Sequence, residues 1–252
     1  MAQRDRVAVV TGGAGGIGRA VCTRLADDGY VVVAVDRVPA AEFEAGFTDA
    51  QHGSFTYHAD LANRAALREF VDWMHSTYDG CDALINCAGI NVYLPNGEQP
   101  PVDELEDDDW DRTLAINLTA PFLLTRGFLP RMKARGWGRI VNIASRAAHM
   151  YYPGANSAYG ASKAGLLGLT RFTAGEAANS GVTSNTVAPG RISTPLANKA
   201  TPEVVQSAVN SIPLGRVGEV GEIAAAVGFL ASEQSSYING AVIDVNGGAY
   251  MP

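Results

Sequence analysis

The sequence has little cysteine and no cysteine pattern that would bind a metal. Its 252 residues include three cysteines, Cys22, Cys81 and Cys87, which are widely spaced and form no CxxC pair. An odd number of scattered thiols without nearby histidine ligands argues against a disulfide framework and against a zinc site. We therefore expect reduced, mostly structural cysteines and no bound metal.

Positive charge and long apolar runs are also scarce. The chain has 19 Lys and Arg against 26 Asp and Glu, a formal net charge of -7. Nucleic acids and anionic membranes attract basic surfaces, so this balance argues against both as partners. Residues 1–6 are largely polar and lead into the short apolar segment 7–10, which is neither a signal peptide nor a membrane span. These features predict a cytoplasmic protein.

The composition that is present suits a globular α/β protein. Hydrophobic residues make up 47% of the chain and glycine occurs 28 times. Short β-branched runs alternate with helical patterns, as in repeated βαβ units. The Pro- and Gly-containing stretches at 91–102 and 189–202 are each only about a dozen residues long, so we interpret them as loops rather than linkers. We predict a single domain over 1–252, a Rossmann-type doubly wound parallel sheet of about seven strands with helices on both faces.

The hydrophobic periodicity places the individual elements. Strands are expected near 6–11, 30–36, 54–59, 82–87, 138–144, 182–188 and 241–245. Crossover helices are expected near 16–28, 63–79, 109–134, 158–179 and 219–231. Residues 37–53 lack a clear period and are expected to hold at most a short helix. The acidic run at 104–111 is expected to begin a helix, where carboxylates favour the positive end of the dipole, rather than to bind a metal.

A glycine-rich turn, Gly12-Gly-Ala-Gly-Gly16-Ile-Gly18, follows the first expected strand and precedes an apolar helix. Glycine lets the backbone approach a pyrophosphate closely, and the helix N-terminus favours that anion. A glycine cluster alone is weak evidence for dinucleotide binding, because glycines are also common in tight turns that bind nothing. The strand before it, the helix after it and an acid downstream favour dinucleotide binding. We expect residues 5–90 to form this half and 91–252 the catalytic half.

The acid that ends the second expected strand bears on the choice of cofactor. Asp36 lies about 20 residues beyond the glycines, where a carboxylate accepts hydrogen bonds from the adenosine ribose hydroxyls. The same carboxylate repels the extra phosphate of NADP, although Arg37 beside it offsets part of this repulsion. NAD is therefore the predicted cofactor and NADP the less favoured one; the plainer alternative for Asp36 is a helix cap or turn residue.

Three side chains in the second half form a candidate catalytic group. Ser145 follows an apolar strand, and Tyr159 and Lys163 lie four residues apart in Tyr-Gly-Ala-Ser-Lys. That spacing brings both side chains to one face of a helix, where the lysine cation stabilises a phenolate. Tyrosine otherwise titrates near pH 10, so a lowered pKa would make it useful for general acid/base work.

At these residues the chain resembles the short-chain dehydrogenase/reductase family. The resemblance extends from about residue 5 to the C-terminus, with the motifs in the family's order. Matching segments are Thr11-Gly12-x-x-x-Gly16-x-Gly18, Asp60-Leu61, Asn86-Cys-Ala-Gly89, Asn117, Ser145, Tyr159-x-x-x-Lys163, and Asn185-x-Val-x-Pro189-Gly190 with Thr194. The strand-four turn departs from the family's Asn-Asn-Ala-Gly at Cys87, which we interpret as a structural substitution.

The resemblance implies a role for each catalytic residue. Tyr159 would exchange a proton with the substrate oxygen, Ser145 would hydrogen-bond that oxygen, and Lys163 would lower the tyrosine pKa and hold the nicotinamide ribose. Asn117, in a helix interrupted near it, would hold a water that relays protons. The implied cofactor contacts are Gly12, Gly15, Gly16, Ile17, Gly18, Asp36, Arg37, Asp60, Leu61, Asn86, Ala88, Gly89, Tyr159, Lys163, Pro189, Gly190, Ile192 and Thr194.

The predicted function is hydride transfer between NAD and a secondary alcohol or ketone. Alternatives are an NADP-dependent 3-oxoacyl-thioester reductase and a dinucleotide-binding regulator without catalysis, since a fold alone does not assign function. Candidate substrates are a sugar or polyol, a hydroxy acid or 3-oxoacyl thioester, and a cyclic or aryl alcohol. The candidate substrate residues are Tyr93, Arg146, Tyr152, Arg191 and Leu196, with an anionic substrate group on Arg146 or Arg191 as one hypothesis. The resemblance also implies a homotetramer.

Overall fold

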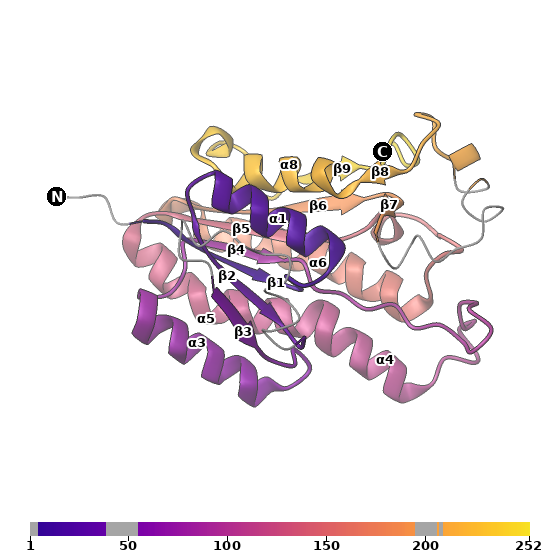
Figure 1. The fold of residues 1–252 in the computed structure, drawn as a ribbon, viewed down its shortest axis with the longest axis horizontal. Helices are drawn as coiled ribbons and strands as arrows, with labels where there is room; N and C mark the ends of the chain where they lie inside the picture. The colour runs from indigo at the N-terminus through magenta and orange to yellow at the C-terminus, as the bar shows by residue number, and fades with distance from the viewer. Residues whose placement is uncertain (1–4, 39–54, 195–205, 207–208) are drawn as a thin grey trace.

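The computed structural model describes residues 5–38, 55–194, 206 and 209–252. Within these residues, seven parallel strands form one sheet in the order β3-β2-β1-β4-β5-β6-β9 (Figure 1). The strands are β1 (Val7–Thr11), β2 (Val31–Asp36), β3 (Phe55–His58), β4 (Ala83–Asn86), β5 (Gly138–Ile143), β6 (Val182–Pro189) and β9 (Val242–Val245). The predicted doubly wound fold is confirmed. The strand order reverses between β1 and β4, and ligands of such sheets bind in the crevice outside the carboxyl ends there.

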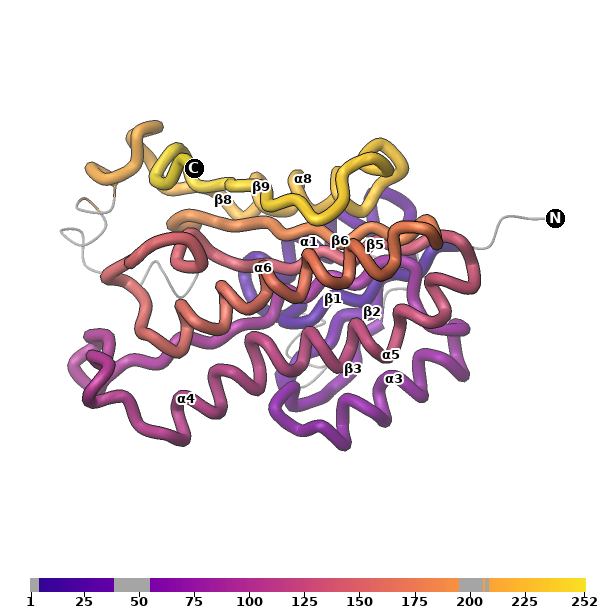
Figure 2. The backbone as a smooth tube through the Cα atoms, turned by 180° about the vertical axis from the view of Figure 1, so that it is seen from behind, coloured from indigo at the N-terminus to yellow at the C-terminus, as the bar shows by residue number. Residues whose placement is uncertain are grey.

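Helices cover both faces of this sheet. On one face α1 (Gly16–Asp27) packs beside α8 (Val220–Ala231). On the other face lie α3 (Arg64–Tyr78), α5 (Ala120–Arg135) and α6 (Ser157–Ala177), as Figure 2 shows from behind. The remaining α-helix of this face, α4 (Asp107–Leu114), packs against α6.

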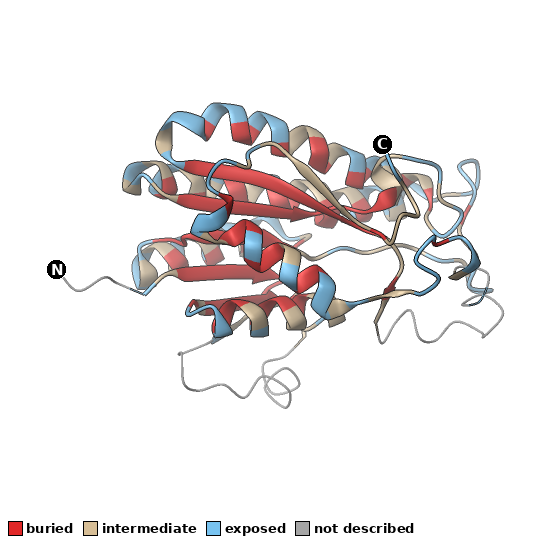
Figure 3. Cartoon of the chain, turned by 90° about the horizontal axis from the view of Figure 1, so that it is seen from above, coloured by how far each residue is buried: buried red, intermediate tan, exposed pale blue. Residues whose placement is uncertain are grey.

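The core consists of two apolar layers, one on each face of the sheet. Every residue of β5 and β6 is buried, and Figure 3 shows these central strands in red between half-buried helices. One layer joins β1 residues such as Val10 to α1 and α8, and the other joins Val9 to α3 and α5. These two strands are therefore buried on both faces, although β6 contains polar residues such as Thr183 and Asn185.

The described elements differ from the expected ones in two places. The helix expected over 109–134 is split, because a π-helical turn (Ala115–Thr119) separates α4 from α5. A short pair of strands, β7 (Ile192–Ser193) and β8 (Gly218–Glu219), was not predicted, since two residues are too few to show a period. The acidic run begins α4 as expected, with three aspartates in the first turn. Most of the segment expected to lack a period, at 39–54, lies outside the described residues.

No helix in the described part of the chain is long and apolar enough to cross a membrane. Within the same residues, no cluster of three or more His, Cys, Asp or Glu side chains is arranged to hold a metal ion. All three cysteines are free thiols.

Candidate active site

The glycine turn between β1 and α1 leaves no room for side chains. A Cβ on Gly18 would lie 2.0 Å from the Gly12 carbonyl oxygen, and a Cβ on Gly12 would lie 2.8 Å from the Ala88 Cα. Gly12 also has a φ of +70°, which favours glycine. Glycine is therefore required at both positions for the β1–α1 turn to pack against the turn after β4.

A cavity of about 460 Å³ opens over this turn. Among the predicted cofactor residues, twelve line it: Gly12, Gly15, Gly16, Ile17, Gly18, Asp36, Arg37, Asp60, Leu61, Ala88, Gly89 and Thr194. The cavity lies at the switch point of the sheet and places the N-terminus of α1 at its base. Its glycine floor and the acid at its edge therefore fit a dinucleotide.

The Asp36 carboxylate accepts a hydrogen bond from the glycine turn. One carboxylate oxygen, Oδ2, accepts a hydrogen bond from the backbone N–H of Ala14 at 3.0 Å, and Oδ1 accepts one from the N–H of Arg37 at 2.7 Å. Arg37 itself is exposed at the edge of the cavity. The carboxylate thus supports the turn as well as presenting negative charge to the cavity.

Six of the predicted cofactor residues do not line this cavity: Tyr159 and Lys163, described below, and the four that follow here. Asn86 is buried in the sheet, where its Nδ2 donates to Asn142 Oδ1 at 2.8 Å. Pro189 ends β6, and Gly190 follows it with its N–H donating to the Val245 carbonyl at 3.0 Å. Ile192 belongs to β7 and is buried. These four residues support the walls of the site rather than its lining.

Tyr159 and Lys163 lie on the first turns of α6, and Ser145 lies on the loop after β5. Asn156 caps the helix, because its Oδ1 accepts from the Tyr159 backbone N–H at 2.9 Å. The Ser145 hydroxyl hydrogen-bonds to the Tyr159 side chain. The predicted grouping of these three side chains is therefore present in the structure, at the carboxyl end of β5.

The two titratable groups have strongly shifted pKa values. Burial raises the pKa of Tyr159 to about 12, and the hydrogen bond with Ser145 opposes this rise. Burial lowers the pKa of Lys163 to about 8. The Lys163 Nζ donates to the Ile143 carbonyl at 2.8 Å and lies 5.7 Å from the centroid of the Tyr159 ring. Lys163 is not among the groups that shift the tyrosine pKa in this structure, where burial dominates, and the phenol is protonated at neutral pH.

Lys163 does not line the cofactor cavity, but its ammonium group lies close to Gly89, which does. A Cβ on Gly89 would lie 3.0 Å from the Lys163 Nζ, and Gly89 lines the cavity. The ammonium group therefore stands between the tyrosine and the space over the glycine turn. This position suits contact with a bound dinucleotide.

Asn117 lies in the π-helical turn and is fully buried. Its Oδ1 accepts from the Ile90 N–H at 2.8 Å, and its Nδ2 donates to the Ile90 carbonyl at 2.9 Å and to Ser162 Oγ at 3.1 Å. The interruption of the helix at Asn117, implied by the family resemblance, is confirmed. Asn117 fastens the loop after β4 to the helix that carries Tyr159.

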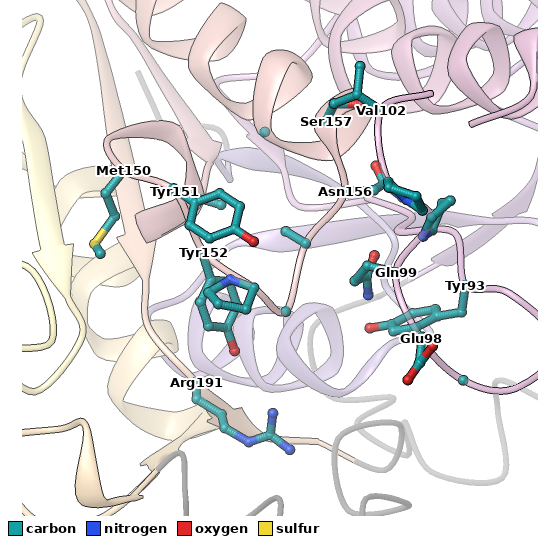
Figure 4. Close-up of a pocket in the computed structure, with 18 of the residues that line it drawn as sticks. Tyr93, Glu98, Gln99, Val102, Met150, Tyr151, Tyr152, Asn156, Ser157 and Arg191 are labelled. Atoms are coloured by element: carbon teal, nitrogen blue, oxygen red, sulfur yellow. The ribbon is translucent and has the colours of Figure 1, made fainter. Parts of the chain in front are cut away.

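A cleft of about 1250 Å³ lies beside these residues (Figure 4). Of the predicted substrate residues, Tyr93, Tyr152 and Arg191 line it. Figure 4 shows Tyr152 and Arg191 on one side of the cleft and Tyr93 with Glu98 on the other. Arg146 does not line the cleft, and Leu196 lies outside the described residues. Thr194 lines both this cleft and the cofactor cavity, so the two spaces adjoin.

Two contributors to the site are absent from the predicted site residues, although one of them, Thr11, stands in the matched glycine motif. Asn156 caps α6, lines the cleft and donates to the Val92 carbonyl at 3.0 Å. An Asn three residues before Tyr159 is a helix-cap signal that points to it. The Thr11 hydroxyl oxygen accepts from the N–H groups of Cys87 and Ala88, each at 3.1 Å, which ties β1 to the turn after β4. No local pattern indicates such a contact.

Comparisons with known proteins show the family to which the chain belongs. A profile of the family described as "Enoyl-(Acyl carrier protein) reductase" matches residues 12–250. The chain is similar to a (3R)-3-hydroxyacyl-CoA dehydrogenase of Canis lupus familiaris, at 35% identity over 98% of this chain and 97% of the relative. It is also similar to an acetoacetyl-CoA reductase of Allochromatium vinosum, at 36% identity over 98% of this chain and 99% of that one.

A solved structure shares the whole fold. A protein of Beutenbergia cavernae, described provisionally as an NAD(P)-dependent gluconate 5-dehydrogenase, superposes with a TM-score of 0.88 at 35% identity, covering 97% of this chain and 96% of that one. That structure holds NADP at low occupancy. The chain belongs to the short-chain dehydrogenase/reductase family. It is an NAD(P)-dependent oxidoreductase that acts on CH–OH and keto groups.

Proposed function

We propose that this protein interconverts a secondary alcohol and a ketone with NAD, using Tyr159 as the general acid/base. The observation that carries the proposal is the grouping of Ser145, Tyr159 and Lys163 between the glycine-floored cavity and the tyrosine-lined cleft. A bound nicotinamide dinucleotide supplies or accepts the hydride, and the protein supplies position and electrostatics.

Tyr159 moves the proton in this proposal. Its raised pKa keeps the hydroxyl protonated at neutral pH, so it donates a proton to the ketone oxygen during reduction. During oxidation the same oxygen must accept the proton of the alcohol. The Ser145 hydroxyl is hydrogen-bonded to the Tyr159 side chain. It is placed to donate a hydrogen bond to the same substrate oxygen and to polarise it.

Lys163 supports both the proton transfer and the cofactor. Its pKa of about 8 leaves it largely charged at neutral pH. A charged ammonium group near a phenol favours the phenolate, and one beside Gly89 is placed to hold the nicotinamide ribose. Asn117 holds the loop after β4 against α6 and, by the family resemblance, holds the water that relays protons onward.

The preference for NAD rests on Asp36. Its carboxylate lines the cavity where the adenosine ribose of a dinucleotide is expected, and negative charge there repels a 2′-phosphate. Arg37 at the same edge is the feature that favours NADP as the alternative. The preference is tested by comparing kcat/KM for NAD and NADP on one substrate.

The substrate enters the cleft lined by Tyr93, Tyr152 and Arg191. A cleft of this size takes a secondary alcohol with a long or bulky substituent, and the names of the relatives make an NADP-dependent 3-oxoacyl-thioester reductase the second candidate. The test measures cofactor absorbance with NADH and NADPH against acetoacetyl-CoA, polyols, hydroxy acids and cyclic alcohols. Cofactor binding without turnover on any of them would instead favour a regulator.

We also propose a homotetrameric, cytoplasmic enzyme. The helix that carries Tyr159 and the helix before the last strand each expose a large aromatic side chain, Phe172 on α6 at 74% and Phe229 on α8 at 39%. The family resemblance implies these two helices as the subunit interface, and that resemblance is what supports the tetramer. Free cysteines are consistent with a reducing compartment. Light scattering of the purified protein tests the tetramer.

A further inference from the structure

One buried cation in this site has a donor without an acceptor among the described residues. Arg146 follows Ser145, and only 6% of its surface is exposed. Its Nε is sealed from solvent and takes part in no hydrogen bond with the described residues. A buried donor without a partner is unfavourable. The Nε of Arg146 therefore lacks an acceptor that a bound ligand could supply.

The other deeply buried arginine shows how this chain satisfies a structural guanidinium. Arg139 is 2% exposed and donates to the carbonyls of Ser232, Gly138 and Gly181, and it also pairs with Glu233. Arg146 has none of these partners. Its recorded contact is with the ring of Tyr152, whose centroid lies 3.9 Å from the guanidinium carbon.

The position of Arg146 relates this charge to the substrate. Tyr152 lines the cleft, and its phenol is close enough to Tyr159 to raise the pKa of that group. Arg146 is thus separated from the cleft by one aromatic ring. A ligand in the cleft therefore reaches the guanidinium only if the half-buried Tyr152 side chain moves aside.

We propose that Arg146 binds a carboxylate group of the substrate, with Tyr152 displaced from the guanidinium as the carboxylate arrives. The planar guanidinium offers paired donors to a carboxylate, a stronger interaction than its contact with the ring. The substrate is then a hydroxy acid or its keto acid. This inference rests on the proposed oxidoreductase function and makes its substrate class more specific.

The kinetic test compares acids with uncharged molecules of the same skeleton. Lactate, 3-hydroxybutyrate and gluconate are each assayed beside their methyl esters at saturating NAD, with wild type, Arg146→Met and Arg131→Met. We expect wild type to prefer at least one acid over its ester, and Arg146→Met to lower that ratio of kcat/KM by about tenfold or more. Arg131→Met removes an exposed charge on α5 that pairs with Asp79, and it is expected to keep the wild-type ratio.

Two results of this assay would overturn the proposal. One is an acid-to-ester ratio in Arg146→Met within about threefold of wild type. The other is a wild type that oxidises neutral alcohols but none of the acids. The second result leaves the proposed oxidoreductase function intact, whereas inactivity on every alcohol and ketone would contradict the function itself.

A stability measurement tests the same idea without turnover. If Arg146 is unpaired in the free protein, Arg146→Met removes a buried uncompensated charge and raises Tm. The acid preferred by wild type, or lactate if none is turned over, should raise Tm in wild type in the presence of NADH and not in the variant. A fall in Tm, or dissociation of the oligomer in Arg146→Met, assigns the charge to a structural or intersubunit contact and overturns the proposal.

Discussion

The side chain of Asn117 pairs with both backbone groups of Ile90, accepting from its N–H at 2.8 Å and donating to its carbonyl at 2.9 Å. This amide-to-backbone pair joins the π-helical turn to the loop that follows β4. It thereby fixes the distance between the edge of the cofactor cavity and the helix that carries Tyr159.

Asn117→Ala should leave the two Ile90 groups unpaired. Each buried unsatisfied group costs about 1–3 kcal/mol, so we expect a lower free energy of unfolding in urea together with reduced turnover. Asn179→Ala, at an exposed position of the turn after α6, serves as the control and should change stability by no more than about 0.5 kcal/mol. Unchanged stability of Asn117→Ala would show that the pair contributes nothing.

Asp36 should control the choice of cofactor. Asp36→Ala removes the charge that opposes NADP but also removes the acceptor for Ala14, whereas Asp36→Asn keeps an acceptor and removes only the charge. We expect both variants to lower the NAD-to-NADP ratio of kcat/KM, with Asp36→Asn retaining the greater stability. An unaltered ratio in both variants would remove Asp36 from cofactor selection.

The elements that the sequence predicts well are those decided by local pattern. The β-branched runs of β1, β2 and β5 mark buried strands, and the four-residue spacing of Tyr159 and Lys163 places both on one face of α6. Glycines at 12 and 18 signal the turn because no other residue fits there.

Features that depend on tertiary packing were not predictable. The Asn86 amide pairs with Asn142 on the neighbouring strand, inside the sheet. Asn86 was expected to contact the cofactor, but in the structure it supports the site from within the sheet. Spacing showed that Lys163 and Tyr159 are close but not that Tyr159 is buried enough for desolvation to raise its pKa. Likewise, nothing local indicates that Arg146 is buried without an acceptor.

The two directions of the reaction should respond differently to pH. Oxidation needs the phenolate of Tyr159, whose pKa of about 12 makes that form scarce, so kcat/KM for the alcohol should rise about tenfold per pH unit from about pH 6 to about pH 8. Reduction needs the protonated phenol and the charged Lys163. It should stay flat over that range and fall above about pH 8, where Lys163 loses its proton. A flat profile for oxidation contradicts this assignment.

Lys163→Ala should impair two functions at once. It removes the charge that favours the phenolate and the group that lies close to Gly89, so both turnover and NADH affinity should fall. NADH fluorescence titration and steady-state kinetics separate the two effects. A normal NADH affinity in this variant would show that Lys163 does not contact the cofactor.

The central claim is that the Tyr159 hydroxyl is the acid/base of the reaction, and Tyr159→Phe tests it most directly. This variant keeps the ring and removes only the oxygen. We measure its NADH affinity by titration and its turnover on the best substrate of the wild type. The account predicts nearly unchanged NADH binding with turnover lowered by at least ~10²-fold. Near-native turnover in a variant that binds NADH normally would contradict it.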